Sequence, residues 1–347
     1  MIGARSALFL PFRDLGLIIV DEEHDTSYKQ EDGVLYNARD MAVLRAAMCS
    51  AQVVLASATP SLETWANAEA GKYKRLDLTS RFGESVLPTM RAVDMRAEDL
   101  LPSTWISPTL KFAMKARLER GEQSLLFLNR RGFAPVTICR ACGAQVACDH
   151  CDSRMVEHRF LKRLMCHQCG ETKPVPEVCP SCQVEGKMAP VGPGIERLGE
   201  EAAALFPEAR IAVLSSDLFG SARALKQRIE EIAAGEADII LGTQLVAKGH
   251  NFPLLTLVGV IDADLGLQGS DLRAAERTFQ LMRQVAGRAG RAEKPGEALL
   301  QTFQPEHPVI RAILSGDEEA FWKADRKSVV EGKRVDLGGR RISKKKR

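Results

Sequence analysis

The stretch Leu15-Gly-Leu-Ile-Ile-Val-Asp-Glu-Glu-His24 joins a continuous apolar run to a cluster of acids. Runs of this kind are typical of strands buried in a parallel sheet, whose functional groups lie at the carboxyl ends. A second run, Gln52–Ala56, ends in Ser57-Ala-Thr-Pro60, and residues 38–47 between the two have helical spacing. The alternation of strand and helix predicts an α/β fold.

Asp21 and Glu22 have the chemistry of a nucleotide-hydrolysis site. The first carboxylate would hold Mg²⁺, usually through water, and the second would orient or deprotonate the attacking water. The alternative interpretation is a strand end with solvated acids. That alternative loses weight because Ser57 and Thr59 follow the next strand, where their hydroxyl groups can link a nucleotide site to a neighbouring ligand.

Alternating helices and strands are expected again in the second part of the chain. The expected helices are 107–120, 196–205, 222–234 and 274–286, and the expected strands are 123–129, 210–214, 237–242, 255–261 and 296–303. Residues 74–106 lose this periodicity and contain several prolines. We therefore expect a connecting segment there, with a strand near Val93.

Residues 241–250, Leu-Gly-Thr-Gln-Leu-Val-Ala-Lys-Gly-His, suit phosphate binding. Gly242 and Thr243 follow a predicted strand, where backbone and hydroxyl groups can contact phosphate, and Lys248 adds a cation. Asp262 and Asp264 close the next predicted strand with two more acids. The segment therefore predicts a second set of nucleotide contacts.

A pair of arginines lies in residues 284–291, Gln-Val-Ala-Gly-Arg-Ala-Gly-Arg. Arg288 and Arg291 are three apart on a helical or near-helical segment, so we expect them to project from one face. Such a pair can stabilise charge on a transferring γ-phosphate. A solvated basic face is the alternative, which Gly287 and Gly290 disfavour because glycine weakens a helix.

Eight of the nine cysteines form four Cys-x₂-Cys pairs: Cys139 and Cys142, Cys148 and Cys151, Cys166 and Cys169, and Cys179 and Cys182. Each pair can act as a unit on one metal, so the block predicts two closed, structural zinc sites of four thiolates. Three ways of combining the four pairs remain possible. Disulfides are the poorer alternative in a chain whose start lacks signal-peptide features. The ninth cysteine, Cys49, is expected in the core.

Together these segments resemble superfamily 2 helicases and, more narrowly, the bacterial replication-restart family of primosomal DNA helicases. The matching motifs are 21–24 (motif II), 57–59 (motif III), 242–250 (motif V) and 284–291 (motif VI), with further likeness at 3–9, 25–30, 129–133 and the cysteine block. The resemblance runs from residue 2 to about residue 324. It implies two RecA-like lobes with ATP between them and a small zinc-binding insertion in the second lobe.

The resemblance also implies boundaries and roles. Lobe 1 would cover residues 1–73, lobe 2 would cover 107–138 and 183–324, and the insertion would cover 139–182, with its first and fourth cysteine pairs together and its second and third together. The catalytic residues would be Asp21, Glu22, Arg288 and Arg291. Contacts to ATP and Mg²⁺, or coupling, would involve Glu23, His24, Ser57, Thr59, Gly242, Thr243 and Gln284. DNA contact or coupling would involve Tyr28, Lys29, Gln30, Tyr36, Arg39 and Lys248, with a plain surface loop as the alternative for residues 24–36.

The ends of the chain carry two further expectations. No Gly-x-x-x-x-Gly-Lys-Ser/Thr loop occurs in the 347 residues, so we expect a fragment with an incomplete first lobe. Residues 325–347 resemble translated sequencing-adapter read-through, and the competing interpretation is a nucleic-acid-binding or nuclear-localisation arm. This tail has a local net charge of +7, which leaves −4 for the rest of the chain.

The expected function is that of an ATP-dependent 3′→5′ DNA helicase of replication restart and primosome assembly, in which the polarity and the restart role rest on the resemblance alone. Its cofactors would be ATP, Mg²⁺ and two Zn²⁺. Its partners would be forked or single-stranded DNA, primosome proteins and single-strand binding protein, in the bacterial cytoplasm at the nucleoid and without a membrane. The alternatives are a zinc-dependent DNA- or protein-binding module without ATPase activity and, less favoured, an RNA helicase.

Overall fold

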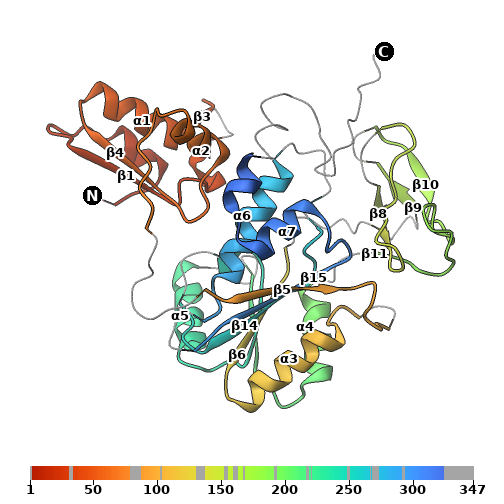
Figure 1. Ribbon diagram of the computed structural model, residues 1–347. Helices are drawn as coiled ribbons and strands as arrows, with labels where there is room; N and C mark the ends of the chain where they lie inside the picture. Colours follow the sequence, from red (N-terminus) through yellow and green to blue (C-terminus); the bar gives the residue numbers. More distant parts are fainter. Residues whose placement is uncertain are drawn as a thin grey trace. The chain divides into compact units, whose positions relative to one another are not determined.

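The computed structural model describes residues 2–30, 34–78, 87–101, 104–129, 137–151, 155–158, 163–166, 169–190, 194–215, 219, 221–247, 251–265, 267, 273–290 and 294–323. The chain forms two compact units, residues 1–77 and 78–347. Both units combine strands with helices (Figure 1), which confirms the α/β fold class. The tail and its two interpretations lie outside the described residues.

The first unit is built on a parallel pair of strands. Strand β1 (Leu17–Asp21) pairs with β4 (Gln52–Ala56), and α1 (Ala38–Met48) connects them and packs on the pair. A short helix, η1 (Arg5–Phe9), precedes β1, and α2 (Leu62–Glu69) follows β4. Both strands and α1 therefore form where the sequence predicts them.

A small hairpin lies between β1 and α1. It consists of η2 (Thr26–Tyr28), β2 (Lys29–Gln30) and β3 (Tyr36–Asn37), and its two strands are antiparallel. Asn37 then caps α1, because its side-chain oxygen accepts a hydrogen bond from the backbone N–H of Arg39 at 3.0 Å. The hairpin thus leads directly into the first turn of α1.

The expectation that β1 and β4 are buried on both faces is wrong. Leu17, Ile19 and Val54 are 50%, 63% and 45% exposed. Because side chains alternate along a strand, all three lie on the same face of the pair. Helix α1 covers the other face, where Val20 is buried. An apolar run thus indicates the strand without showing whether both of its faces are covered.

The second unit is built on a six-stranded sheet whose paired strands are all parallel. The order across the sheet is β12 (Ile211–Leu214), β13 (Ile239–Gly242), β6 (Gln123–Phe127), β14 (Leu255–Val260), β15 (Glu297–Thr302) and β5 (Thr89–Asp94). Every residue of β13, β6 and β14 is buried. These central strands behave as their continuous apolar runs predict.

Helices cover both faces of this sheet. Helices α3 (Pro108–Glu119) and α4 (Ile195–Leu205) pack on one face, and Figure 1 shows α5 (Ala222–Ala233) on the opposite side. Helix α6 (Ala274–Ala286) connects β14 to β15 on the side of α5, as right-handed crossovers require. Helix α7 (Pro308–Ser315), which the sequence interpretation did not include, packs against α6 and β5.

The segment 74–106, expected to connect two parts of the chain, also contributes a strand to the large sheet. Its strand near Val93 is β5, the edge strand of the six-stranded sheet, and it pairs with β15 in register from Thr89 to Asp94. Val93 and Met95 belong to the core that α3 and α4 cover. Pairing with β15, which lies some 200 residues further along the chain, is a long-range contact that the local sequence does not reveal.

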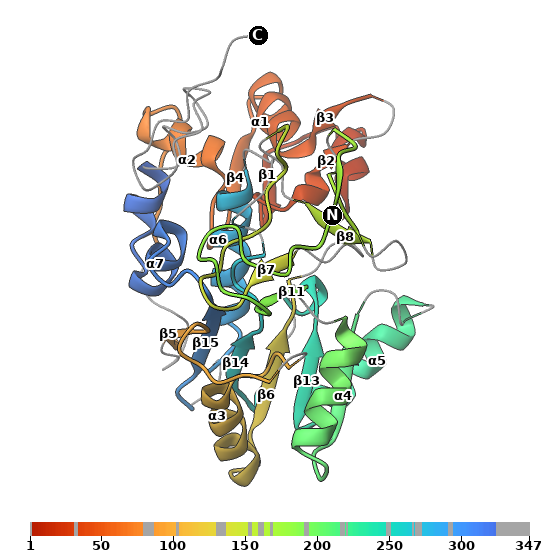
Figure 2. The same ribbon diagram turned by 90° about the vertical axis from the view of Figure 1, so that its right-hand side faces the viewer.

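The cysteine block forms its own small antiparallel structure. Strand β7 (Thr137–Cys139) pairs with β11 (Met188–Pro190) (Figure 2), while β8 (Val156–His158), β9 (Arg163–Met165) and β10 (Thr172–Pro174) form a second sheet (Figure 1). Gly143 packs so closely on Phe303, just beyond β15, that a Cβ would lie 2.9 Å from that side chain. The insertion is thus held against the end of the large sheet.

Two smaller observations complete the fold. Cys49 is exposed just after α1, so the expectation of a core position is wrong. No helix in the described part of the chain is both long and apolar enough to cross a membrane.

Candidate active site and metal centres

Asp21 and Glu22 lie at the carboxyl end of β1 and face solvent. The Asp21 carboxylate accepts a hydrogen bond from the backbone N–H of Glu22 at 3.0 Å. Glu22 has a positive φ of 48°, an uncommon conformation for a residue with a side chain, and its side chain is 51% exposed. The sharp turn directs both carboxylates away from the strand, where water and a cation have access to them.

The next strand end lies beside this turn. The Nδ1 atom of His24 is 2.7 Å from the hydroxyl oxygen of Ser57, which also accepts a hydrogen bond from the backbone N–H of Thr59 at 3.0 Å. The same ring atom is 3.6 Å from a Glu22 carboxylate oxygen. The structure therefore brings Glu22 and His24 together with Ser57 and Thr59, which lie more than 30 residues further along the chain.

Glu23 is buried and occupies the centre of a hydrogen-bond network. Its carboxylate accepts from the backbone N–H of Ser61 at 2.6 Å, the Ser61 hydroxyl at 2.9 Å and the Thr64 hydroxyl at 2.9 Å. The guanidinium of Arg39 donates a fourth bond at 3.3 Å. Sequence reasoning missed Ser61 and Thr64, although Ser61 is the N-cap of α2 and capping residues of this type are recognisable in a sequence.

The hairpin residues expected to contact DNA differ in their exposure and in their contacts. Lys29 is exposed, while Gln30 and Tyr36 are half-buried, and Tyr36 packs edge-on against Phe9 with ring centres 5.4 Å apart. Tyr28 donates from its hydroxyl to the backbone carbonyl of Asp21 at 2.7 Å. Burial, and then the charge of Asp21, raise the pKa of Tyr28.

Arg39 does not present its guanidinium to solvent as the expected DNA contact requires. It is buried, and it binds the carboxylate of Glu23, the carboxylate of Asp40 at 2.8 Å and the hydroxyl of Ser61 at 2.6 Å. The pattern of a basic residue beside aromatic ones indicated a surface role. The structure places Arg39 in the interior because Glu23 offers it a buried carboxylate.

In the second unit, Gly242 and Thr243 follow β13 as expected. Gly242 is buried, and a Cβ there would lie 2.4 Å from a methyl group of Val246 in η4 (Gln244–Ala247), so only glycine fits. Thr243 donates its backbone N–H to the carbonyl of Leu214 at 3.3 Å. Lys248 lies outside the described residues.

Helix α6 carries the half-buried Gln284 and ends at Ala286, before the expected arginine pair. Arg288 is buried and donates to the backbone carbonyl of Ala247. Gly290 has a φ of +68°, and a Cβ on it would lie 2.4 Å from the backbone nitrogen of Gly296. The helical spacing that placed both arginines on one face therefore stops before Arg291, which lies outside the described residues.

Asp262 and Asp264 are interior residues. One Asp262 oxygen accepts backbone N–H bonds from Asp264 and Leu265, at 3.0 and 3.1 Å, while the other has no partner among the described residues. Burial, and then the charge of Asp264, raise the pKa of Asp262 to about 7. With Gln145 and Phe303 they line a small cavity between the large sheet and the cysteine block. Both aspartates are only 6% exposed.

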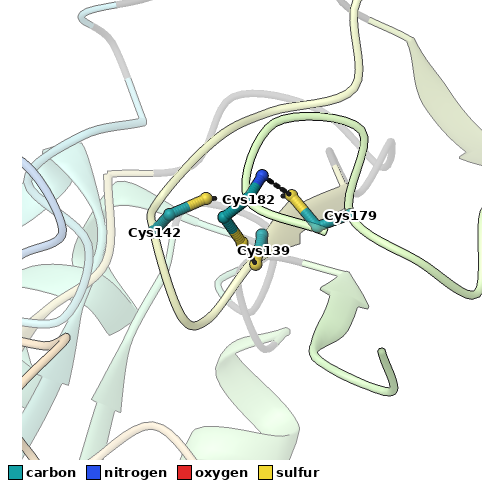
Figure 3. A group of neighbouring side chains, drawn as sticks. All are labelled: Cys139, Cys142, Cys179 and Cys182. Carbon is teal, nitrogen blue, oxygen red and sulfur yellow. Dashed lines mark hydrogen bonds between the residues drawn. The ribbon is translucent and has the colours of Figure 1, made fainter. Parts of the chain in front are cut away.

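The cysteines gather into two groups of four, in the nested arrangement that the resemblance implies. Cys139, Cys142, Cys179 and Cys182 form the first group (Figure 3), and Cys148, Cys151, Cys166 and Cys169 form the second. In the first, the sulfur of Cys139 is 3.6 Å from that of Cys182, and Cys142 is 3.7 Å from Cys179. In the second, the corresponding distances are 3.5 and 3.4 Å.

In three of the four cysteine pairs a local turn explains why both sulfurs face a common point. The residues that follow Cys142, Cys169 and Cys182 have positive φ values, and each donates its backbone N–H to the carbonyl of the first cysteine of its pair. The glycines at two of these positions adopt that conformation without strain. The chain is thereby folded so that both sulfurs of a pair point the same way.

The sulfur geometry fits zinc. Four thiolates at about 2.3 Å from a tetrahedral ion lie about 3.8 Å from one another, and a disulfide would need about 2.05 Å. Backbone N–H groups of Ser181 and Cys182 point at the sulfur of Cys179, and against the effect of burial they lower its pKa to about 7. His150 is not a member of either cysteine group, and its Nδ1 atom lies 3.4 Å from a carboxylate oxygen of Glu171. His167 lies outside the described residues.

Comparison with known proteins agrees with the cysteine block as a zinc-binding element. Residues 148–174 match the family described as the PriA DNA helicase Cys-rich region (CRR) domain. The replication restart protein PriA of Rickettsia conorii is 50% identical over 322 residues, which are 93% of this chain and 50% of that protein. PriA of Bacillus subtilis is 44% identical over 93% of this chain and 40% of its own length.

The resemblance to replication-restart helicases is therefore confirmed along 93% of the chain, which spans about half the length of the curated relatives it matches. Among solved structures, RecG bound to a three-way DNA junction aligns over 94% of this chain and 32% of its own, with 14% identity and a TM-score of 0.47.

Proposed function

Since the chain shares half of its aligned residues with a PriA replication restart protein, we propose that it supplies the helicase core of an ATP-dependent 3′→5′ DNA helicase that restarts replication. The observation that carries the proposal is the exposed pair Asp21 and Glu22, fixed beside Ser57 and Thr59 by His24. An apolar strand that delivers two solvent-facing acids beside a second hydroxyl-bearing strand end is suited to nucleotide hydrolysis.

In this proposal each residue has a definite task. A bound Mg²⁺ would neutralise charge on the nucleotide phosphates. Asp21 would hold that ion, and Glu22 would orient the attacking water. Gly242 and Thr243 contact phosphate, Gln284 assists from α6, and Arg288 and Arg291 stabilise charge on the transferred group.

The two cysteine groups bind zinc for stability. Both are closed sets of four thiolates with no position for a substrate, so the metals hold the insertion together rather than take part in chemistry. The insertion also packs on the end of the large sheet through Gly143 and Phe303. Loss of zinc would therefore disturb the second unit as well as the insertion itself.

DNA contact is assigned to the hairpin of the first unit. Tyr28 and Tyr36 suit base stacking, and Lys29 and Gln30 suit contact with the phosphate backbone. Outside the hairpin, in the second unit, Lys248 suits the same contact. The likeness to replication restart proteins supports forked or single-stranded DNA as the substrate, with primosome proteins and single-strand binding protein as partners and the nucleoid as the location. The rival proposal is a zinc-dependent binding module that does not hydrolyse ATP.

ATP hydrolysis by the protein as encoded at its native locus distinguishes the two. We expect DNA-stimulated hydrolysis in the wild type, and a loss of at least 100-fold in Glu22→Gln with nucleotide binding retained, because the amide cannot serve as a base. Hydrolysis that Glu22→Gln leaves intact would contradict the proposal, and an inert wild type that binds zinc and DNA would favour the rival. Residues 1–347 alone, which contain no phosphate-binding loop, should bind about two zinc ions per chain and hydrolyse little ATP.

A further inference from the structure

The two groups of four cysteines differ in how far their members are covered. In the first group (Figure 3), Cys139 and Cys179 are buried and the other two members are half-buried. In the second group Cys148 and Cys166 are buried, while Cys169 is exposed. Solvent, and any reagent dissolved in it, therefore has direct access to one member of the second group.

The turns that follow Cys142 and Cys169 show where this difference comes from. Both turns carry a glycine with a positive φ, so their backbone conformations are alike. Gly143, after Cys142, packs against Phe303, since an added Cβ would lie 2.9 Å from that side chain. Gly170, after Cys169, lies beside open space, because an added Cβ would meet none of the described residues within 4 Å apart from its chain neighbours. The first group is thus covered by the large sheet and the second is not covered at this point.

A second contact ties the first group to the rest of its unit. Arg140, between Cys139 and Cys142, donates to the backbone carbonyls of Leu101 and Thr104 at 3.0 and 3.1 Å. The second group lies instead between the strands β8, β9 and β10, which form a separate sheet within the insertion. A chemical change at the second group can therefore occur while the contacts that hold the insertion in place persist.

Within the second group, the exposed cysteine lies opposite a buried partner that is held in place. The sulfur of Cys169 is 3.5 Å from that of Cys148. Cys148 packs in a small apolar cluster of the insertion, and Asp149 after it accepts a hydrogen bond from the ammonium group of Lys173 at 2.9 Å. A disulfide needs a sulfur–sulfur distance of about 2.05 Å, so the two atoms must approach by roughly 1.5 Å. The exposed Cys169 can make this movement towards its fixed partner.

We propose that the second cysteine group is an oxidant-sensitive modification site, in which hydrogen peroxide joins Cys169 to Cys148 in a disulfide and the zinc of this group is lost. Cysteines that bind zinc are thiolates, the form that peroxide oxidises, and susceptibility follows exposure. This inference rests on the zinc binding of the proposed function and is independent of ATP hydrolysis.

The reaction balances with peroxide as the oxidant. The Cys169 thiolate attacks one peroxide oxygen, the O–O bond breaks, and a sulfenic acid and hydroxide form. The Cys148 thiolate then attacks the sulfenic sulfur, which forms the S–S bond and releases a second hydroxide. The two thiolates together lose two electrons, and the peroxide gains them. Two thiolates remain for the metal, too few for a closed site of four.

The test treats the zinc-loaded chain with hydrogen peroxide in a Cys49→Ser background, because Cys49 and Cys169 are the two exposed cysteines among the nine. A pyridylazoresorcinol dye measures released zinc. About one of two zinc ions per chain should leave at least about tenfold faster than the other. Alkylation followed by peptide mass spectrometry should then show a disulfide between Cys169 and Cys148, with the first group still reduced. Dithiothreitol and added Zn²⁺ should reverse the change.

Two serine variants in the same background form a matched pair, since each replaces the second cysteine of a Cys-x₂-Cys pair. Cys169→Ser removes the proposed target and leaves the first group intact. Cys182→Ser disrupts the first group and leaves the second intact. The zinc that remains in Cys169→Ser should be released by peroxide at least about tenfold more slowly than the zinc that remains in Cys182→Ser.

Three results would count against the inference. Release of both zinc ions at the same rate, or oxidation of the first group before Cys169, would overturn it while leaving the zinc sites of the proposed function intact. Selective release without a reversible disulfide at Cys169 would overturn it as well. A chain that takes up no zinc before treatment would overturn the zinc assignment together with this inference.

Discussion

Two strand ends in this molecule share one sequence pattern, an apolar run followed by two acids, and differ in how far those acids are buried. Strand β1 delivers Asp21 and Glu22, and strand β14 delivers Asp262 and Asp264. The first pair faces solvent, and the second pair is buried under the cysteine block. An apolar run followed by acids thus indicates a strand end, but the burial of the acids depends on what the rest of the chain places over it.

The difference has an electrostatic consequence. Desolvation penalises the ionised form of a carboxylate, and it raises the pKa of both Asp262 and Asp264. Asp264 offsets part of this penalty by accepting bonds from the Thr302 hydroxyl and, at 2.6 Å, from the backbone N–H of Phe303. The buried acids are therefore expected to affect stability, and the exposed acids are expected to affect chemistry.

The largest expected effect on stability is that of Asp264→Ala. It leaves the buried Thr302 hydroxyl and the Phe303 N–H without their acceptor, which should lower the free energy of unfolding by about 2–4 kcal/mol. Urea unfolding of the zinc-loaded chain measures it. Asp264→Asn keeps one acceptor oxygen and should lose clearly less. Equal stability of wild type and Asp264→Ala would mean that this strand end is as open as the first.

Asp262→Asn should have a smaller effect of the opposite sign. The folded-state pKa of about 7 lies above the usual value of 3.8, so ionisation makes the native state progressively less stable as the pH rises from about 4 through 7. Asparagine removes that loss, so its gain grows with pH across this window. We expect Tm to rise by roughly 2–4 °C at pH 8 and by less at pH 5. A larger gain at pH 5 than at pH 8 would contradict the assignment.

The same contrast shows what the sequence can predict. Periodicity located β1, β4, α1 and the strands of the large sheet, because local apolar pattern sets local structure. Cysteine spacing predicted zinc but left three ways of combining the four cysteine pairs. The family resemblance selected one of them, the nested arrangement, and the two groups of four in the structure have that arrangement. Residue type did not predict that Arg39, Arg288 and Asp262 are buried. Their burial depends on contacts with residues far away in the chain: Glu23, Ala247 and the cysteine block.

The exposed face of β1 and β4 gives a third prediction. Ile19 has little packing to lose, so Ile19→Thr should change the free energy of unfolding of the first unit by less than about 0.5 kcal/mol. It should reduce self-association of the isolated chain, because contiguous exposed apolar side chains favour aggregation. Light scattering at increasing concentration measures it, and Val20→Thr on the covered face is the matched control, expected to destabilise. A cost above 1 kcal/mol for Ile19→Thr would mean that this face is covered.

The smallest stability effect is expected for Glu22→Gln, the substitution proposed to abolish hydrolysis. The side chain is half exposed, and its carboxylate lies 3.6 Å from the ring nitrogen of His24. Glutamine has the same shape and fits the backbone φ of 48° equally well. Pairs of this kind contribute little to stability in water. Thermal unfolding at pH 7.5 should therefore give a Tm within about 1 °C of wild type. A shift of several degrees would show that Glu22 holds the turn together, and a lost ATPase activity in the same variant would then no longer identify it as the group that acts on water.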